Sequence, residues 1–279
     1  MNSRLNSRLN TRVGTGGDAG PRADAWTATP AGGAPRASRS ALYHPTVARL
    51  TARGLLGRRA LPLGALVVLL LVVVAAVRAI GGADDGTAED VLRGFVLSPL
   101  VPLAGVIVGT GAIGPEIEDG SIVYLLSKPV RRGTIITTKL LVAVALTLAA
   151  TAVPTLVAGF VLNGNGQDLA VSYAVSAAVA SVAYSAVFLL LAVVTRHAVV
   201  AGLVYALVWE TLIGSLVPGA RTLSVQQWAL AVGARAARGD LVSSAVSLPT
   251  AVVLLLAVTV GATWYAARRL RVLKPVADE

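Results

Sequence analysis

The sequence has no cysteine, which excludes a disulfide framework, a thiolate metal site and a cysteine nucleophile. Lysine is almost as scarce. The three lysines follow Ser127, Thr138 and Leu273, so the chain has no Gly-Lys-Ser/Thr phosphate-binding loop and does not bind and hydrolyse ATP by that route. Charged residues make up only 14% of the 279 residues, where soluble domains have about 25%.

Apolar residues dominate what is present. They make up 55% of the chain, and the mean hydropathy of +0.74 is too high for a surface that faces water. Long stretches carry no charge, and the basic residues gather between them. This composition is typical of a polytopic membrane protein.

Six apolar segments are long enough, at about 1.5 Å per residue, to cross a hydrocarbon core of about 30 Å. They cover residues 60–80, 95–113, 140–162, 171–194, 199–217 and 246–267. We therefore predict an all-α fold with six transmembrane helices in a membrane domain over 41–274. Residues 1–40, rich in Gly, Ser, Pro and Arg, are expected to form a disordered cytoplasmic tail, with a second short tail at 275–279.

The net charge of +10 follows from membrane topology and needs no nucleic-acid partner. Most basic residues flank the apolar segments on the side of the N-terminus, whereas Asp84, Asp85, Glu89 and Asp90 fall in the opposite loop, 81–90. Because basic loops stay in the cytoplasm, both termini are expected to lie there, in a bacterial plasma membrane.

Two segments outside the six spans have helical periodicity. Residues 43–59 predict a basic amphipathic helix, an elbow at the cytoplasmic interface anchored by Arg49 and Arg53, although a plain positively charged flank fits equally well. Residues 218–245 predict an amphipathic helix on the outer face, anchored by Trp228 at the headgroups. A re-entrant hairpin that begins near Gly214 is the alternative.

Two features within the spans are candidates for function. Glu210 is the one acidic residue inside a predicted span, and we hypothesise that it faces a dimer interface or an outer cavity. A hydrogen-bonded helix contact and a proton-carrying role are the alternatives. Gly105 and Gly109 are spaced for close helix approach, and ordinary packing is favoured over a dedicated dimer motif.

The predicted cytoplasmic loop, 115–139, is the most informative stretch. It opens with acidic residues, continues with an apolar run, breaks at Lys128-Pro129 and closes with basic residues. An apolar patch ringed by charge indicates a docking element, with a solvated loop as the alternative. The candidate docking residues are Glu116, Glu118, Asp119, Gly120, Lys128, Pro129, Arg131 and Arg132.

The run from Glu118 to Arg132 (EDGSIVYLLSKPVRR), followed by Lys139, resembles a bacterial exporter signature. It is similar to the pattern acid-x-Gly, Leu-Leu-Ser-x-Pro-Val and a later Lys found in ABC transporter permeases of the drug, antibiotic and polysaccharide export class. The resemblance covers about 43–273, and Trp209-Glu210 also resembles actinobacterial members. Arg131 departs from the pattern, because members often have Ser there.

This resemblance implies a permease subunit that is not itself an enzyme and holds no cofactor. It implies a coupling helix over 129–137 that docks in a separate ATPase subunit, where Arg131 and Arg132 meet acidic groups. ATP and Mg would bind to that partner, present in two copies, and a second permease chain would complete a dimer. The cargo would be hydrophobic or amphipathic and would leave the cell.

Other function classes fit less well. An intramembrane protease or a CDP-alcohol transferase needs serine, histidine or aspartate patterns that the spans lack. A secondary transporter that uses Glu210 as its proton carrier remains the alternative, although no internal repeat is visible. A membrane scaffold without transport is a third possibility.

Overall fold

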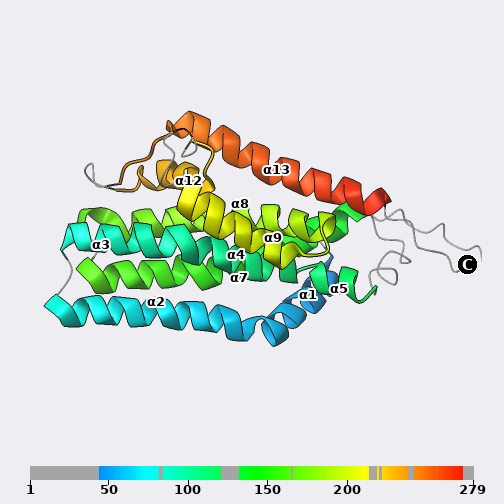
Figure 1. Cartoon of the computed structure of the whole chain (residues 1–279), viewed down its shortest axis with the longest axis horizontal. Coiled ribbons are helices and arrows are strands. Elements are labelled where there is room, and N and C mark those ends of the chain that lie inside the picture. Colours follow the sequence, from blue (N-terminus) through cyan, green and yellow to red (C-terminus); the bar gives the residue numbers. More distant parts are fainter. Residues whose placement is uncertain are drawn as a thin grey trace, which may run out of the picture. The chain divides into compact units, whose positions relative to one another are not determined.

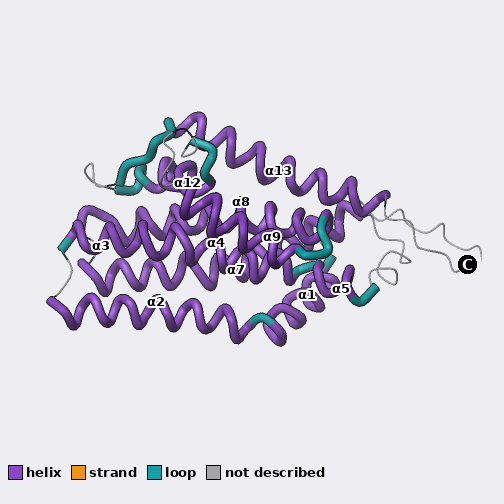
Figure 2. Tube along the Cα trace, in the orientation of Figure 1, coloured by secondary structure: helices purple, strands orange, loops and turns teal. Residues whose placement is uncertain are grey.

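The computed structural model describes residues 44–81, 84–120, 132–164, 166–213, 219, 222–237 and 242–272, and within them it contains helices and no strand. Figure 2 shows helices along almost all of this part of the chain, with short loops between them. Five helices are long and apolar enough to cross a membrane. The prediction of an all-α polytopic membrane protein is therefore confirmed.

The N-terminal part of the membrane domain consists of α1 (Pro45–Arg58), α2 (Ala60–Gly81) and a long composite helix. That composite runs through α3 (Asp85–Val91), the π-helical segment η1 (Leu92–Leu100) and α4 (Val101–Gly111), and the short α5 (Gly114–Glu118) follows it. Pro99 lies inside η1. A proline supplies no backbone N–H for the regular helical pattern, which explains why the winding loosens there.

The C-terminal part begins with α7 (Arg132–Asn163), a 3₁₀ turn η2 (Gly166–Asp168) and α8 (Leu169–Val194). The shorter pair α9 (Ala198–Val204) and η3 (Tyr205–Ile213) comes next, followed by α12 (Val225–Gly233) and α13 (Leu248–Val272). Figure 1 shows α1, α5 and the end of α13 at one end of the bundle, and α3, α12 and the start of α13 at the other.

Helix α8 lies at the centre of the bundle. It contacts α4, α7, α12 and α13. In its most apolar stretch of 18 residues 61% are buried inside the protein, against 11% in the corresponding stretch of α2. Its many Ala and Ser side chains let neighbouring helices approach closely. The Leu- and Val-rich α2 is instead largely exposed, as expected for a helix that faces lipid.

Small residues make two of these approaches possible. Gly109 of α4 lies so close to α8 that a Cβ atom would be 2.7 Å from the Cβ of Phe188 and 3.2 Å from the backbone nitrogen of Leu189. Gly233 of α12 similarly lies against the backbone oxygen of Ser172, whose Oγ donates a hydrogen bond of 2.9 Å to the Gly233 carbonyl. The predicted close-approach pair, Gly105 and Gly109, thus serves helix packing within the chain.

The helix boundaries differ from the predicted spans before the second span. The predicted outer loop 81–90 is mostly helix, because α3 begins at Asp85 and Asp84 caps it by accepting a hydrogen bond of 2.9 Å from the Thr87 backbone N–H. The hydrogen bonds from Thr87 hold the pKa of the Asp84 carboxyl below its usual value. The described part of the predicted fifth span, 199–217, is helical in α9 and η3, and residues 214–217 lie outside the described residues.

Helix α12, in the segment before the last span, lies inside the protein, contrary to the prediction of an interfacial helix. Trp228 was expected at the headgroups, yet its side chain is only 4% exposed and its Nε1 donates to the Thr222 carbonyl at 2.8 Å. Gln226 and Gln227, expected on a wet face, are also buried. Helix α12 packs against α8 and α13, and the start of the alternative hairpin near Gly214 lies outside the described residues.

Close packing of α4 on α8 predicts a clear asymmetry between two glycine substitutions. Gly109→Ala should lower the free energy of unfolding by about 1–3 kcal/mol, because backbone atoms of α8 block the new methyl group. Gly64→Ala on α2, where nothing lies within 4 Å, should be neutral or stabilising by up to about 1 kcal/mol. Thermal unfolding of the purified protein in detergent would test this, and equal midpoints for the two variants would contradict the described crossing.

Candidate functional site

The strongest cluster of polar contacts in the candidate loop lies where α4 gives way to α5. Helix α4 ends at Gly111, and Pro115 sits in the first turn of α5, so the chain turns at Ala112 and Ile113. The last carbonyls of a helix lack partners within the helix and carry partial negative charge. Here the Ala112 carbonyl accepts a hydrogen bond of 2.6 Å from the Lys139 Nζ.

The same ammonium group forms an ion pair with Glu116. The distance from Lys139 Nζ to Glu116 Oε1 is 2.7 Å, and the lysine side chain is 0% exposed while that of the glutamate is 31% exposed. A buried ammonium without a partner would be strongly destabilising, so the pair fixes the relative position of α5 and α7. We call Lys139, Glu116 and the Ala112 carbonyl the inner clamp.

The first turns of α7 contact two further helices. Arg132 donates from Nη1 to the Leu270 carbonyl near the C-terminus of α13 at 2.6 Å. A cation is favourable at a helix C-terminus, where backbone carbonyls lack partners. Thr138 accepts a hydrogen bond of 3.0 Å from the His44 backbone N–H at the start of α1. Helix α7 thus connects α1, the α4–α5 turn and α13.

The structure places only part of the predicted docking set. Glu116 belongs to the inner clamp, Asp119 is exposed, and Gly120 adopts a left-handed backbone with a φ of 67°, which glycine favours. Glu118 ends α5, but its side chain lies outside the described part. Three residues lie wholly outside the described residues: Lys128, Pro129 and Arg131.

The structure adds two facts about this loop. Residues 132–137 of the predicted coupling helix, 129–137, belong to α7, which continues to Asn163, while 129–131 lie outside the described residues. The Arg132 guanidinium donates a hydrogen bond to α13, and its expected contact with a partner subunit stays a prediction. Sequence spacing missed both the α13 contact and the role of Lys139, because the partners lie far away along the chain.

The elbow helix exists as α1. Ala48, Thr51 and Leu55 are buried, and Arg49 and Arg53 lie together on the exposed face. The predicted amphipathic pattern is therefore found in the structure, with the basic face pointing away from the bundle. The membrane-anchoring role of the two arginines stays a prediction.

Glu210 lies inside the protein, with only 2% of its surface exposed. Its carboxylate accepts hydrogen bonds from the Ser224 hydroxyl at 2.5 Å, the Val225 backbone N–H at 3.1 Å and the Tyr205 hydroxyl at 3.1 Å. Ser224 and Val225 form the N-terminus of α12, where backbone N–H groups favour an anion. Glu210 thus joins η3 to α12, which contradicts the hypothesis of an outer cavity or dimer interface.

Hydroxyl groups form a second polar layer between α7 and α8. Thr151 and Ser181 share a hydrogen bond of 2.8 Å, and Ser185 donates to Thr147 at 3.2 Å. All four side chains are completely buried. They join α7 to α8 within the interior of the bundle.

The fold and the comparisons together define the class of protein. Five long apolar helices in the described part of the chain, with α8 at their centre and polar contacts at both ends of the bundle, make this a multi-pass membrane protein. A family profile described as "ABC-2 family transporter protein" matches residues 54–269. The chain therefore belongs to the ABC-2 family and is an ABC transporter permease, as the resemblance implied. No curated protein matches the chain.

The inner clamp predicts an unusual order of stability among its variants. Glu116→Gln leaves a fully buried ammonium without its countercharge, so it should lower the free energy of unfolding by about 3 kcal/mol. Adding Lys139→Met to that variant should restore much of the loss, because a neutral, apolar side chain then fills the site. Thermal unfolding of both variants tests this, and a double variant less stable than Glu116→Gln alone would contradict the clamp.

The Glu210 contacts predict that α12 loosens when the carboxylate is removed. Glu210→Ala deletes three hydrogen bonds at a buried site, each worth about 1.5–3 kcal/mol for a charged acceptor, so α12 should lose protection. The native chain lacks cysteine, so Ala229→Cys on the buried face of α12 supplies a single label site. Maleimide labelling should be slow with Glu210 present and fast in the Glu210→Ala variant. Equal rates would show that the carboxylate does not hold α12.

Proposed function

We propose that this chain is the permease subunit of an ATP-driven exporter, and that segment 115–139 receives mechanical work from a separate ATPase subunit. One observation supports this most. The described residues on both sides of the central stretch, 121–131, are fastened to the bundle, Glu116 through the inner clamp and Arg132 through α13. A displacement of α5 or of the start of α7 should therefore move several spans.

These contacts determine which helices a force on the segment would move. A push on α5 acts on α4 through the short turn at Ala112 and on α7 through Lys139. A push on the start of α7 acts on α13 through Arg132. Close-packed helices move as bodies and do not deform continuously, so a local displacement becomes a shift of whole helices.

The proposed orientation rests on charge. The end of the bundle with α1 and α5 carries most of the described basic residues, and the other end carries Asp84, Asp85, Glu89 and Asp90. By the preference of basic segments for the cytoplasm, the end with α1 and α5 faces inward in a bacterial plasma membrane. That is also the side on which an ATPase meets its nucleotide.

The proposed assembly completes the transporter. Members of this family normally work with an ABC ATPase, and the sequence has no phosphate-binding loop of its own. We place two ATPase copies, with their ATP and Mg, against the inner end of two permease chains. A hydrophobic or amphipathic cargo fits the aliphatic character of the spans.

Capture of the ATPase subunit tests this function. Lys128→Gln/Arg131→Gln removes two positive charges from the coupling segment and should reduce the ATPase that copurifies from native membranes by about tenfold, the scale of one lost charged contact. The matched control Arg49→Gln/Arg53→Gln removes two charges from the elbow and should retain the ATPase. Full capture of the ATPase by the Lys128→Gln/Arg131→Gln variant would contradict the proposal, and so would ATP-independent transport by the purified chain.

A further inference from the structure

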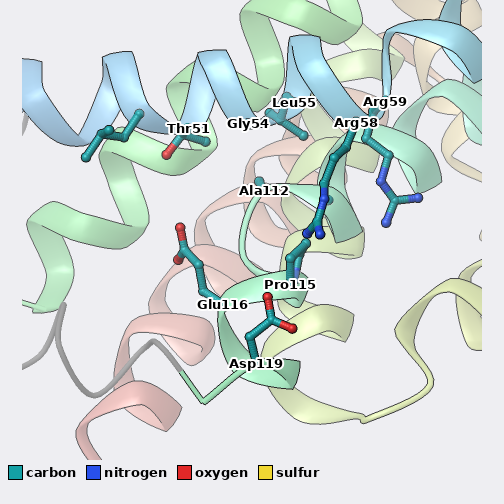
Figure 3. Close-up of a pocket in the computed structure, with 11 residues that line it drawn as sticks. Thr51, Gly54, Leu55, Arg58, Arg59, Ala112, Pro115, Glu116 and Asp119 are labelled. Carbon is teal, nitrogen blue, oxygen red and sulfur yellow. The ribbon is translucent and has the colours of Figure 1, made fainter.

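A cavity of about 190 Å³ lies between the elbow helix α1 and the turn from α4 to α5. It is smaller than the sites of drug-sized ligands, which are about 300–1,000 Å³, so it has room for a small group. Figure 3 shows its two walls, with Arg58 at the end of α1 and Arg59 directly after it on one side, and with Glu116 on α5 and Asp119 directly after that helix on the other. Apolar atoms, among them those of Leu50 and Leu55, line much of the rest.

The two walls carry opposite charges, but within the described residues these charges form no ion pair with each other. In the part of the chain that the structure describes, Arg58, Arg59 and Asp119 take part in no salt bridge. Glu116 is engaged by Lys139 on the far side of the turn. The cavity lining therefore carries two guanidinium groups and a carboxylate, a set of charges that suits a ligand with an anionic and a cationic end.

The position of Arg59 is fixed by packing. Its side chain passes over Gly111 of α4, where an added Cβ would lie 3.2 Å from Nε and 3.3 Å from Cγ. The absence of a side chain at Gly111 thus lets Arg59 lie flat against α4 at the edge of the cavity. A guanidinium held in this way is well suited to a phosphate, which it binds with two parallel hydrogen bonds.

The surroundings of the cavity point to a lipid. The neighbouring faces of α1 and α2 expose Leu50, Leu56 and Leu61 by 61%, 56% and 85%. In the proposed orientation these leucines face the acyl chains of the inner leaflet, and the arginines lie at the level of its headgroups. A headgroup in the cavity would let its chains run along α1 and α2.

We propose that this cavity binds the zwitterionic headgroup of a phosphatidylethanolamine. The phosphodiester lies on Arg58 and Arg59, and the primary ammonium group donates hydrogen bonds to Asp119. The bound lipid joins the elbow to the α4–α5 turn, next to the inner clamp. The inference rests on the proposed orientation but not on ATP-driven export, so each can fail separately.

Native mass spectrometry of the delipidated full-length protein tests this inference. Phosphatidylethanolamine should be retained about tenfold more than phosphatidylcholine, whose trimethylated nitrogen has no N–H to donate to Asp119. Asp119→Asn, at an exposed position, should abolish that preference. Arg58→Gln/Arg59→Gln should lower the retention of both lipids by about tenfold.

The controls distinguish a specific binding site from nonspecific electrostatic attraction of lipid to the protein. Arg268→Gln/Arg269→Gln removes the same charge from exposed positions of α13 outside the cavity and should leave retention unchanged. Equal retention of the two lipids by the native chain would overturn the proposal, as would an equal loss in this control. Tighter binding of phosphatidylglycerol, or competition by inorganic phosphate, would show an anion site instead and would also overturn it.

Discussion

A positive charge that water cannot reach must have a partner, and Lys139 is that charge in this protein. Its ammonium group, fully buried at the start of a spanning helix, is held by the Glu116 carboxylate and the Ala112 carbonyl. The partner groups belong to a helix end and to the short helix after it, so satisfying one charge also fixes the turn between α4 and α5. The arrangement of the whole inner end depends on this constraint.

In the other half of the bundle a buried carboxylate requires partners in the same way as the buried ammonium group. Glu210 is buried, and the N-terminus of α12 supplies the donors that it requires. Helix α12 has only nine residues and would be marginal on its own. Its position inside the protein depends on the carboxylate at one end and on the close contact of Gly233 with Ser172 at the other. Each buried charge thus fixes an element that hydropathy alone would leave free.

Hydropathy predicted the long spans because lipid requires uninterrupted apolar surface and satisfied backbone groups. It set helix limits too narrowly where charged residues extend a helix, as Asp85 and Glu89 do in α3 and Arg132 does in α7. It also misplaced α12. Helical spacing shows that one face of a helix is more polar than another. It does not show whether the polar face meets lipid headgroups or the protein interior, where Gln227 accepts a hydrogen bond from the Ala245 backbone N–H.

Contacts between distant residues were the part that the sequence did not reveal. Lys139 and Arg132 were recognised as basic residues of one loop, yet their partners are Glu116 and the carbonyl of Leu270, 138 positions from Arg132. The resemblance directed attention to segment 115–139, which contains Glu116, Arg132 and Lys139. It did not show that these three side chains bind other parts of the same chain, because a motif gives residue types and not their distant partners.

The side of the membrane on which the inner clamp lies is the most direct test of this description. Single cysteines at Asp119, beside the clamp, and at Arg235, after α12, are both exposed and suit a membrane-impermeant maleimide. In intact cells the cysteine at 235 should react and that at 119 should not, and inverted vesicles should give the reverse. Labelling of position 119 from outside intact cells would contradict the assignment of segment 115–139 to an ATPase partner.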